Sequence, residues 1–173
     1  FNLSAEMVAA LAEKGFTNPS PIQALVIPEF LREKANIIGQ AQTGTGKTAA
    51  FGLPLLNLIS KAERHPQALI VCPTRELCLQ ITNDLAIFSK HSKGIFTEAV
   101  YGGASINTQM IAMIYVNVLV ATPGRLLELV ASKAVHLAEI STLVLDEADK
   151  LLNLGFKEEV DKVLALLPKK RQN

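Results

Sequence analysis

The chain has 173 residues, of which 49% are hydrophobic and 19% are charged, so it is long enough for one domain with a sizeable core and too apolar to be disordered. The 17 Lys and Arg residues against 16 Asp and Glu residues give a formal net charge of +1. This balance excludes a strongly basic footprint, so any contact with nucleic acid must come from a local surface.

The first 32 residues predict two helices joined by an extended segment. Ser4 is a suitable N-cap for a helix that Gly15 ends. Ser20 and Pro21 suit the N-cap and the first position of a second helix. Pro28 within that helix predicts a kink or an early break.

Residues 41–48, with the sequence AQTGTGKT, predict a phosphate-binding loop. The apolar run 36–39 before them predicts a strand, and residues 49–59 after them predict a helix. The curled backbone and the positive end of the helix dipole would direct N–H groups at an anion. We expect Lys47 to reach the β- and γ-phosphates and the Thr48 hydroxyl to coordinate Mg²⁺.

The loop departs from the generic pattern, because Ala41 replaces its first glycine and an additional glycine stands at Gly44. The alternative is a glycine-rich turn that carries a lysine by chance. The predicted strand before the loop and helix after it favour the nucleotide site.

Short apolar runs alternate with helices through the rest of the chain. The predicted strands are residues 68–71, 96–101, 118–120 and 142–145, and the predicted helices are residues 75–89, 106–114, 123–130, 148–152 and 156–167. Continuous apolar strands indicate burial on both faces, so we predict an α/β fold with a parallel sheet and helices on either side. Ligands of such sheets bind beyond the carboxyl ends of the strands.

Two carboxylates follow the last predicted strand. Asp146 stands where a nucleotide-hydrolysing enzyme places a metal contact, and Glu147 beside it could orient or deprotonate a water molecule. The alternative is that both residues only cap the next helix. The phosphate-binding loop elsewhere in the chain favours the catalytic interpretation.

Polar residues at other predicted loops suit binding rather than catalysis. The Gln23 amide and the Phe16 ring could recognise a base through hydrogen bonds and stacking. Hydroxyls, exposed N–H groups and two arginines follow three strands, and such groups suit a sugar-phosphate backbone without reading bases. Taken singly, each of these loops is better explained by ordinary capping and turn chemistry; the residues are Pro73, Thr74, Arg75, Gly102, Gly103, Thr122, Pro123, Gly124 and Arg125.

In order along the chain, these motifs resemble those of the first RecA-like domain of a DEAD-box ATP-dependent RNA helicase. Residues 15–23 resemble the Q motif, residues 41–48 motif I, including its alanine, and residues 73–77 motif Ia. Gly102-Gly103 resembles the double-glycine motif and residues 122–125 motif Ib. Asp146-Glu147-Ala148-Asp149 is the tetrapeptide that gives this family its name.

The resemblance implies a RecA-like P-loop fold over residues 1–173 and a role for each motif. Phe16 and Gln23 would hold adenine, and the loop residues Thr43, Gly44, Thr45, Gly46, Lys47 and Thr48 would hold the phosphates of ATP. Mg²⁺ would lie on Thr48 and Asp146, with Lys47, Asp146 and Glu147 as catalytic residues. The three loops named above would bind single-stranded or duplex RNA through its backbone.

The resemblance also implies that the chain is one of two RecA-like domains that act together. A start at Phe1 rather than methionine indicates a piece of a longer protein. The family's Ser-Ala-Thr motif, expected soon after Asn173, and its second RecA-like domain lie outside the chain. We therefore expect a monomeric domain that is nearly inactive in hydrolysis and depends on the second domain for local unwinding of RNA.

Two other functions remain open on the sequence. A DNA helicase would share the nucleotide motifs, although Gln23 and Asp149 favour the RNA family. A nucleotide-gated module that docks a protein partner would bind ATP without turnover. Cys72 and Cys78 lack zinc or redox spacing, and no apolar run reaches the roughly 18 residues of a membrane span. The expected location is the cytoplasm, or the nucleus in a eukaryote.

Overall fold

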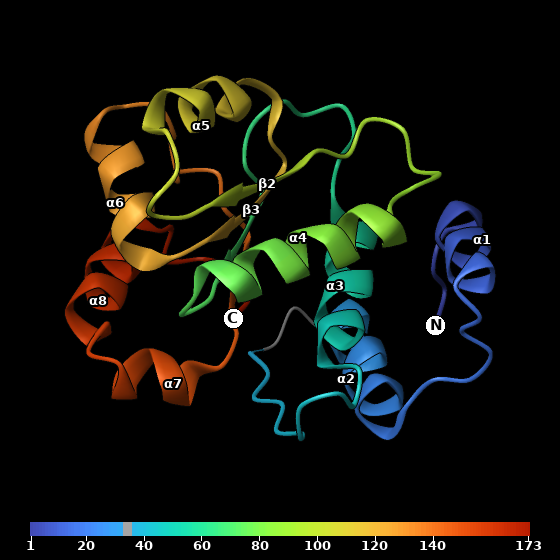
Figure 1. The fold of residues 1–173 in the computed structure, drawn as a ribbon. Coiled ribbons are helices and arrows are strands. Elements are labelled where there is room, and N and C mark those ends of the chain that lie inside the picture. Colours follow the sequence, from blue (N-terminus) through green and yellow to red (C-terminus); the bar gives the residue numbers. More distant parts are fainter. Residues whose placement is uncertain (33–35) are drawn as a thin grey trace.

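Four of the apolar runs pair into one parallel sheet in the computed structural model, which describes residues 1–32 and 36–173 (Figure 1). The strands are β1 (Ala68–Val71), β2 (Thr97–Val100), β3 (Val118–Ala121) and β4 (Thr142–Leu145), in the order β2-β3-β1-β4. The registers Ala68 with Val118 and Thr142, and Thr97 with Val118, align all four strands. Their carboxyl ends therefore meet at one edge of the sheet.

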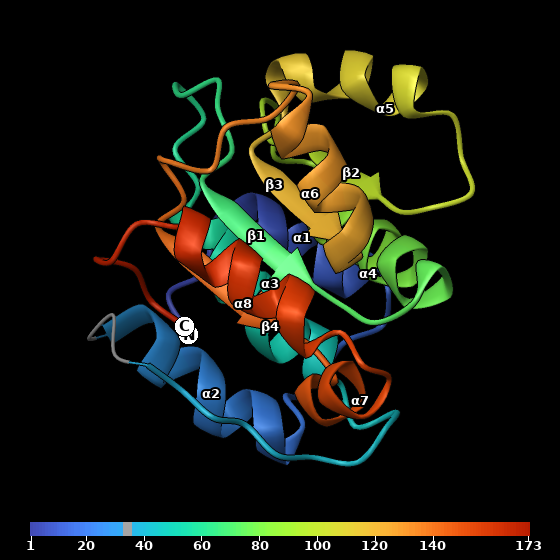
Figure 2. The ribbon, with the colours of Figure 1, turned by 90° about the vertical axis from the view of Figure 1, so that its left-hand side faces the viewer.

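Helices cover both faces of this sheet, which confirms the predicted layers (Figure 2). Leu69, Leu119 and Leu143 point into one core with α6 and α8, while Ile70 and Val120 point into the other with α3 and α4. The helices are α1 (Ala5–Glu13), α2 (Pro21–Arg32), α3 (Lys47–Leu58), α4 (Arg75–Phe88), α5 (Ile106–Ala112), α6 (Pro123–Ala131), α7 (Ala148–Asn153) and α8 (Lys157–Leu166), and a short 3₁₀ helix covers Met113–Tyr115.

Local capping groups set several helix starts where the sequence predicts them. The Ser4 hydroxyl accepts a hydrogen bond from the Met7 N–H at 3.3 Å, and the Thr74 hydroxyl accepts one from the Leu77 N–H at 3.2 Å. These bonds satisfy backbone donors that have no partner within the helix. Each cap thereby favours one residue as the first of its helix.

Pro28 does not end α2, so of the predicted kink or early break the break is wrong. The helix continues to Arg32. Ile27 and Phe30, on either side of the proline, are both buried in the core beneath α3. Burial of these side chains offsets the one helical hydrogen bond that the proline ring removes.

The strand predicted at residues 36–39 is also wrong, because these residues have no regular secondary structure. A strand needs a neighbour for its backbone groups, and a cavity of about 130 Å³ lies between this segment and β4. At the start of the segment, the Ile37 N–H donates to the Asn173 carbonyl at 2.9 Å. Gln172 in turn forms a parallel bridge with Thr142 of β4, so the last residues of the chain lie between the two.

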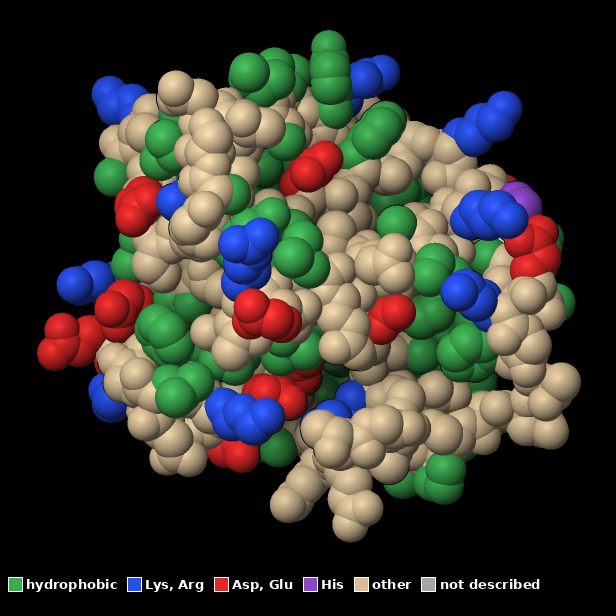
Figure 3. Space-filling view, in the orientation of Figure 1, with side chains coloured by type: hydrophobic (Ala, Val, Ile, Leu, Met, Phe, Trp, Pro, Cys, Tyr) green, Lys and Arg blue, Asp and Glu red, His purple; other side chains and the backbone are tan. Residues whose placement is uncertain are grey.

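Charged side chains are mixed on the surface, and the two cysteines are in the interior. Basic and acidic side chains are interspersed over the face in Figure 3, and the described residues form no continuous basic surface there. Cys72 and Cys78 are both free and buried. No helix in the described part of the chain is long and apolar enough to cross a bilayer.

Asn117 ties together the amino-terminal ends of the strands, and we expect its loss to destabilise the fold. Its buried amide accepts from the Phe96 N–H and donates to the Glu63 carbonyl, both at 2.9 Å. Asn117→Ala leaves the Phe96 N–H and the Glu63 carbonyl without this hydrogen-bond partner, and it should lower the free energy of unfolding by about 1–3 kcal/mol. Urea unfolding measures this loss, and Asn107→Ala, at an exposed position, should be nearly neutral. Equal stability of both variants would contradict the prediction.

Candidate nucleotide and nucleic-acid site

The loops that carry the predicted motifs gather at the carboxyl edge of the sheet. The phosphate-binding loop leads into α3, and Asp146 and Glu147 follow β4. A cavity of about 470 Å³ joins them, lined by Lys14, Phe16, Thr43, Gly44, Gly46, Lys47, Thr48, Ala49, Leu77, Gln80, Asp84, Ile87, Phe88, Asp146 and Glu147. Residues from distant parts of the chain thus surround one space of the size that small-molecule ligands occupy.

Glycines give the loop its shape. Gly44 and Gly46 have φ angles of +80° and +87°, a region that L-residues with a side chain rarely adopt. Gly46 is also the N-cap of α3, with no side chain capping the helix. The first N–H groups of this 12-residue helix therefore start at the cavity, where an anion can satisfy them.

Gly46 carries a second constraint, and we expect Gly46→Ala to destabilise the protein more than Gly44→Ala. An alanine at either position costs about 1–2 kcal/mol for the left-handed backbone. At Gly46 the new methyl group would also overlap the Gln23 amide, whereas nothing lies near Gly44. Thermal unfolding of both variants measures the difference. Gly124→Ala, in open space within α6, is the control, and equal losses at Gly44 and Gly46 would count against the overlap.

The two carboxylates after β4 differ in their surroundings. Burial raises the pKa of Asp146, and the positive charge of Lys47, which lines the same cavity, opposes this rise. Glu147 has a left-handed backbone with a φ of +50°, and its carboxylate forms an ion pair with Lys150 at 2.8 Å. A strained non-glycine residue at a site is typical of a functional constraint.

The donor set at Thr48 and Asp146 fits Mg²⁺. Both side chains line the cavity beside the phosphate-binding loop, and both offer hard oxygen atoms. Mg²⁺ usually takes one or two protein ligands and completes its shell with phosphate oxygens and water. The described residues hold no cluster of three or more His, Cys, Asp or Glu, so an all-protein metal cage is absent from this part of the chain.

Gln23 is bonded within the protein, which the sequence did not indicate. Its Oε1 accepts from the Ser20 N–H at 3.0 Å and its Nε2 donates to the Gly46 carbonyl at 3.2 Å. Gln23 and Phe16 both line a second cavity of about 270 Å³, and Phe16 also borders the cavity at the loop. Phe16 is 44% exposed, and its ring packs edge-on against that of Phe88 with 6.3 Å between the ring centroids. Base recognition by this pair stays a prediction.

Sequence reasoning missed the contribution of α4 to the cavity. Gln80, Asp84 and Phe88 lie four residues apart, so they share one face of the helix. Burial raises the pKa of the Asp84 carboxylate, and Lys14 opposes the rise. The spacing of these side chains was the available signal, but the sequence alone does not tell which helix face meets the loop.

The predicted RNA residues divide into exposed and buried groups. Arg75, Gly102, Gly103 and Gly124 are exposed at the carboxyl edge, whereas the side chains of Pro73 and Pro123 are buried and shape their loops from beneath. Thr122 and Thr74 precede α6 and α4 as N-caps and are partly buried. These loops follow β1, β2 and β3, which are neighbours in the sheet.

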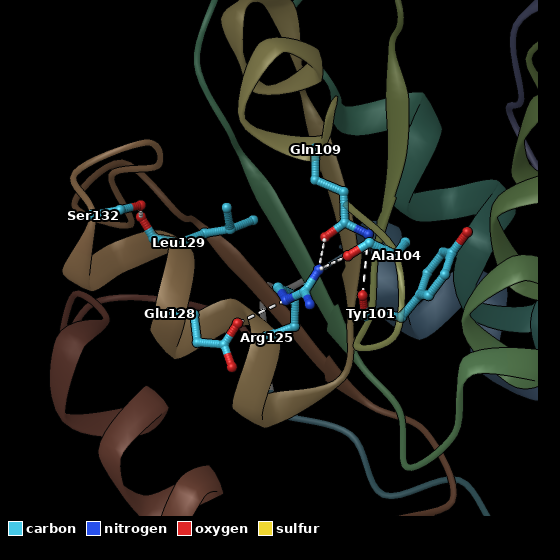
Figure 4. Close-up of polar contacts among 7 residues, drawn as sticks. All are labelled: Tyr101, Ala104, Gln109, Arg125, Glu128, Leu129 and Ser132. Carbon is cyan, nitrogen blue, oxygen red and sulfur yellow. Dashed lines mark hydrogen bonds and ion pairs between the residues drawn. The ribbon is translucent and has the colours of Figure 1, made fainter. Parts of the chain in front are cut away.

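Arg125 points inward, unlike Arg75. Its side chain is only 11% exposed and is surrounded by acceptors on three residues (Figure 4). Nη1 donates to the Ala104 carbonyl and to Gln109 Oε1, both at 3.0 Å, and Nε donates to the Glu128 carboxylate at 2.8 Å. The guanidinium therefore already has a carboxylate partner within the fold.

Comparison with known proteins identifies relatives of this arrangement. A family model described as DEAD/DEAH box helicase matches residues 20–173. The chain is 49% identical over 172 residues to the DEAD-box ATP-dependent RNA helicase CshA of Streptococcus pneumoniae, covering 99% of the chain and 32% of that protein. It is 43% identical over 171 residues to the ATP-dependent RNA helicase DeaD of Escherichia coli, covering 98% and 27%.

A solved structure shares the fold as well. The DEAD box protein of the hyperthermophile Methanococcus jannaschii superposes with a TM-score of 0.94 at 38% identity, covering 99% of this chain and 47% of that one. The similarity confirms the predicted RecA-like P-loop fold. The chain spans about a third or less of the length of the two curated relatives.

Proposed function

Because the chain belongs to the DEAD/DEAH box helicase family, we propose that residues 1–173 are the N-terminal RecA-like, ATP-binding domain of an RNA-dependent ATPase that locally unwinds RNA duplexes. One observation carries the proposal. Lys47 and Thr48 at the start of α3 line the same cavity as Asp146 and Glu147 after β4. Phosphate-binding and water-activating groups thus surround a single space.

In the proposed site, the backbone of Thr43 to Thr48 holds the phosphates and Lys47 balances their charge. Thr48 and Asp146 would hold Mg²⁺, which supplies neutralisation of charge on the β- and γ-phosphate oxygens. Glu147 orients the attacking water and accepts its proton. Phe16 and Gln23 contact adenine, and the bond from Gln23 to the Gly46 carbonyl links base recognition to the loop.

RNA would lie across the loops after β1, β2 and β3. Arg75 offers an exposed cation there, and Gly102, Gly103 and Gly124 let a sugar-phosphate backbone approach closely. Such contacts bind without reading bases. We place the protein in the cytoplasm, or in the nucleus of a eukaryote, and this domain as a monomer until its second RecA-like domain closes over ATP and RNA.

The domain alone should be nearly inactive in hydrolysis. Transferring phosphate groups are commonly stabilised by an arginine supplied from outside the P-loop, which is worth roughly 10³–10⁵ in rate. The second RecA-like domain would supply this group. The two curated relatives are about three or more times as long as this chain, so they are long enough to contain such a domain.

Turnover of ATP with and without single-stranded RNA, by this chain and by the parent protein with its second domain, tests the proposal. We expect turnover only when RNA and both domains are present. Equal stimulation by DNA would favour a DNA helicase. Binding of ATP without turnover under every condition would favour a nucleotide-gated docking module instead.

A further inference from the structure

The exposed loop Gly102–Gly103 is held at both of its ends by hydrogen bonds from the side chains of Gln109 and Arg125. The Tyr101 carbonyl, directly before the glycines, accepts from Gln109 Nε2 at 3.1 Å. The Ala104 carbonyl, directly after them, accepts from Arg125 Nη1 at 3.0 Å. Arg125 Nη1 also donates to Gln109 Oε1 at 3.0 Å, so the hydrogen bonds at the two ends of the loop form one continuous network (Figure 4).

This network is buried beneath the loop. Gln109 is only 7% exposed and the Arg125 side chain 11% exposed, whereas Gly102 and Gly103 are exposed. A buried amide and guanidinium with well-placed partners restrict a loop strongly, because every broken bond would leave a polar group unpaired. Arg125 also carries the Glu128 carboxylate as its counter-ion.

The same loop contacts the neighbouring RNA element on its other side. The Arg75 guanidinium lies over the Tyr101 ring, 4.9 Å from its centroid. The loop after β2 is thereby joined to the start of α4 through Tyr101 and to the start of α6 through Arg125. Fixing the Gly102–Gly103 loop therefore constrains the placement of all three loops relative to one another.

We infer that Gln109 and Arg125 are positioning residues for RNA: they hold the Gly102–Gly103 loop against the other two loops and do not contact phosphate themselves. This inference rests on the proposed function, in which those loops bind RNA. It assigns a role to Gln109 that no motif indicates, and it makes Arg75 rather than Arg125 the phosphate-binding arginine.

Salt dependence of RNA binding separates positioning from charge. In the parent protein with a non-hydrolysable ATP analogue, anisotropy of a fluorescent oligouridine is measured at several KCl concentrations. Each lost phosphate contact to a single strand reduces the slope of log affinity against log salt by about 0.7. We expect Arg75→Gln to reduce the slope, and Gln109→Ala and Arg125→Lys to weaken binding by about tenfold with an unchanged slope.

Arg125→Lys is informative because lysine keeps the charge but lacks the planar fork that reaches several acceptors. Gln109→Ala and Arg125→Lys combined should be no weaker than either alone, since they interrupt one network. In ATP turnover, the RNA concentration for half-stimulation should rise while kcat at saturating RNA stays unchanged. Thr108→Ala, at an exposed position on the same helix, is the control.

Two results would overturn the inference. A reduced slope in Arg125→Gln together with wild-type binding by Gln109→Ala would make Arg125 a phosphate ligand. Unchanged amide hydrogen exchange at residues 101–105 in Gln109→Ala would show that the amide does not hold the loop. If the unaltered protein bound no RNA, the proposed function itself would be wrong. Faster amide hydrogen exchange at residues 101–105 in Gln109→Ala would then show that Gln109 and Arg125 hold the loop only for structural reasons.

Discussion

Glu147→Gln should abolish most ATP hydrolysis while leaving ATP binding intact. Glutamine has the shape of glutamate and can still orient a water molecule, but it cannot accept a proton. Loss of a general base costs about 10²–10⁴ in rate, so kcat of the parent protein with saturating RNA should fall by that factor. ATP affinity should change little, because Lys47 and the loop backbone provide the phosphate contacts.

The ion pair between Glu147 and Lys150 calls for a matched control. Lys150→Met removes the pair and keeps the carboxylate, so its kcat should stay close to that of the unaltered protein. Glu158→Gln, an exposed carboxylate on α8, controls for loss of charge. Turnover that survives in Glu147→Gln, or that falls equally in Lys150→Met, would assign the glutamate a structural role.

The predictions that succeeded rest on signals carried by neighbouring residues. The run at Ala68–Val71 is a strand with the predicted bounds, because four successive apolar residues are buried on both faces. Ser4 and Thr74 cap helices through bonds that span three residues. The alignment of all strand ends at one edge then followed from parallel topology, which placed Asp146 and the loops after β1, β2 and β3 at the same edge without any distance being known.

The failures involve interactions with distant residues. Residues 36–39 are as apolar as a strand, yet their nearest backbone partner is Asn173 at the other end of the chain. A proline disfavours the interior of a helix, yet α2 continues past Pro28, with Ile27 and Phe30 buried in the core on either side of it. Gln109 and Arg125 stand 16 residues apart, and only the fold shows that the arginine faces an amide instead of solvent.

Lys47→Ala should weaken ATP binding to an extent that Glu147→Gln does not. Lys47 lines the cavity with the glycines of the loop and forms no ion pair within the described residues, so its ammonium can meet phosphate. Charge-assisted hydrogen bonds contribute about 1.5–3 kcal/mol, which corresponds to a loss of roughly 10- to 100-fold in affinity.

Isothermal titration of the parent protein with ATP and Mg²⁺ measures this loss, and Lys61→Ala, at an exposed lysine that does not line the cavity, serves as the control. The Lys47→Ala protein should also unfold at a temperature close to that of the unaltered protein, because Lys47 forms no ion pair among the described residues and only its electrostatic attraction to Asp146 is lost. Comparing the two active-site variants then separates binding from chemistry. Equal ATP affinity of Lys47→Ala and Glu147→Gln would contradict both assignments, since the phosphates would have to be held elsewhere.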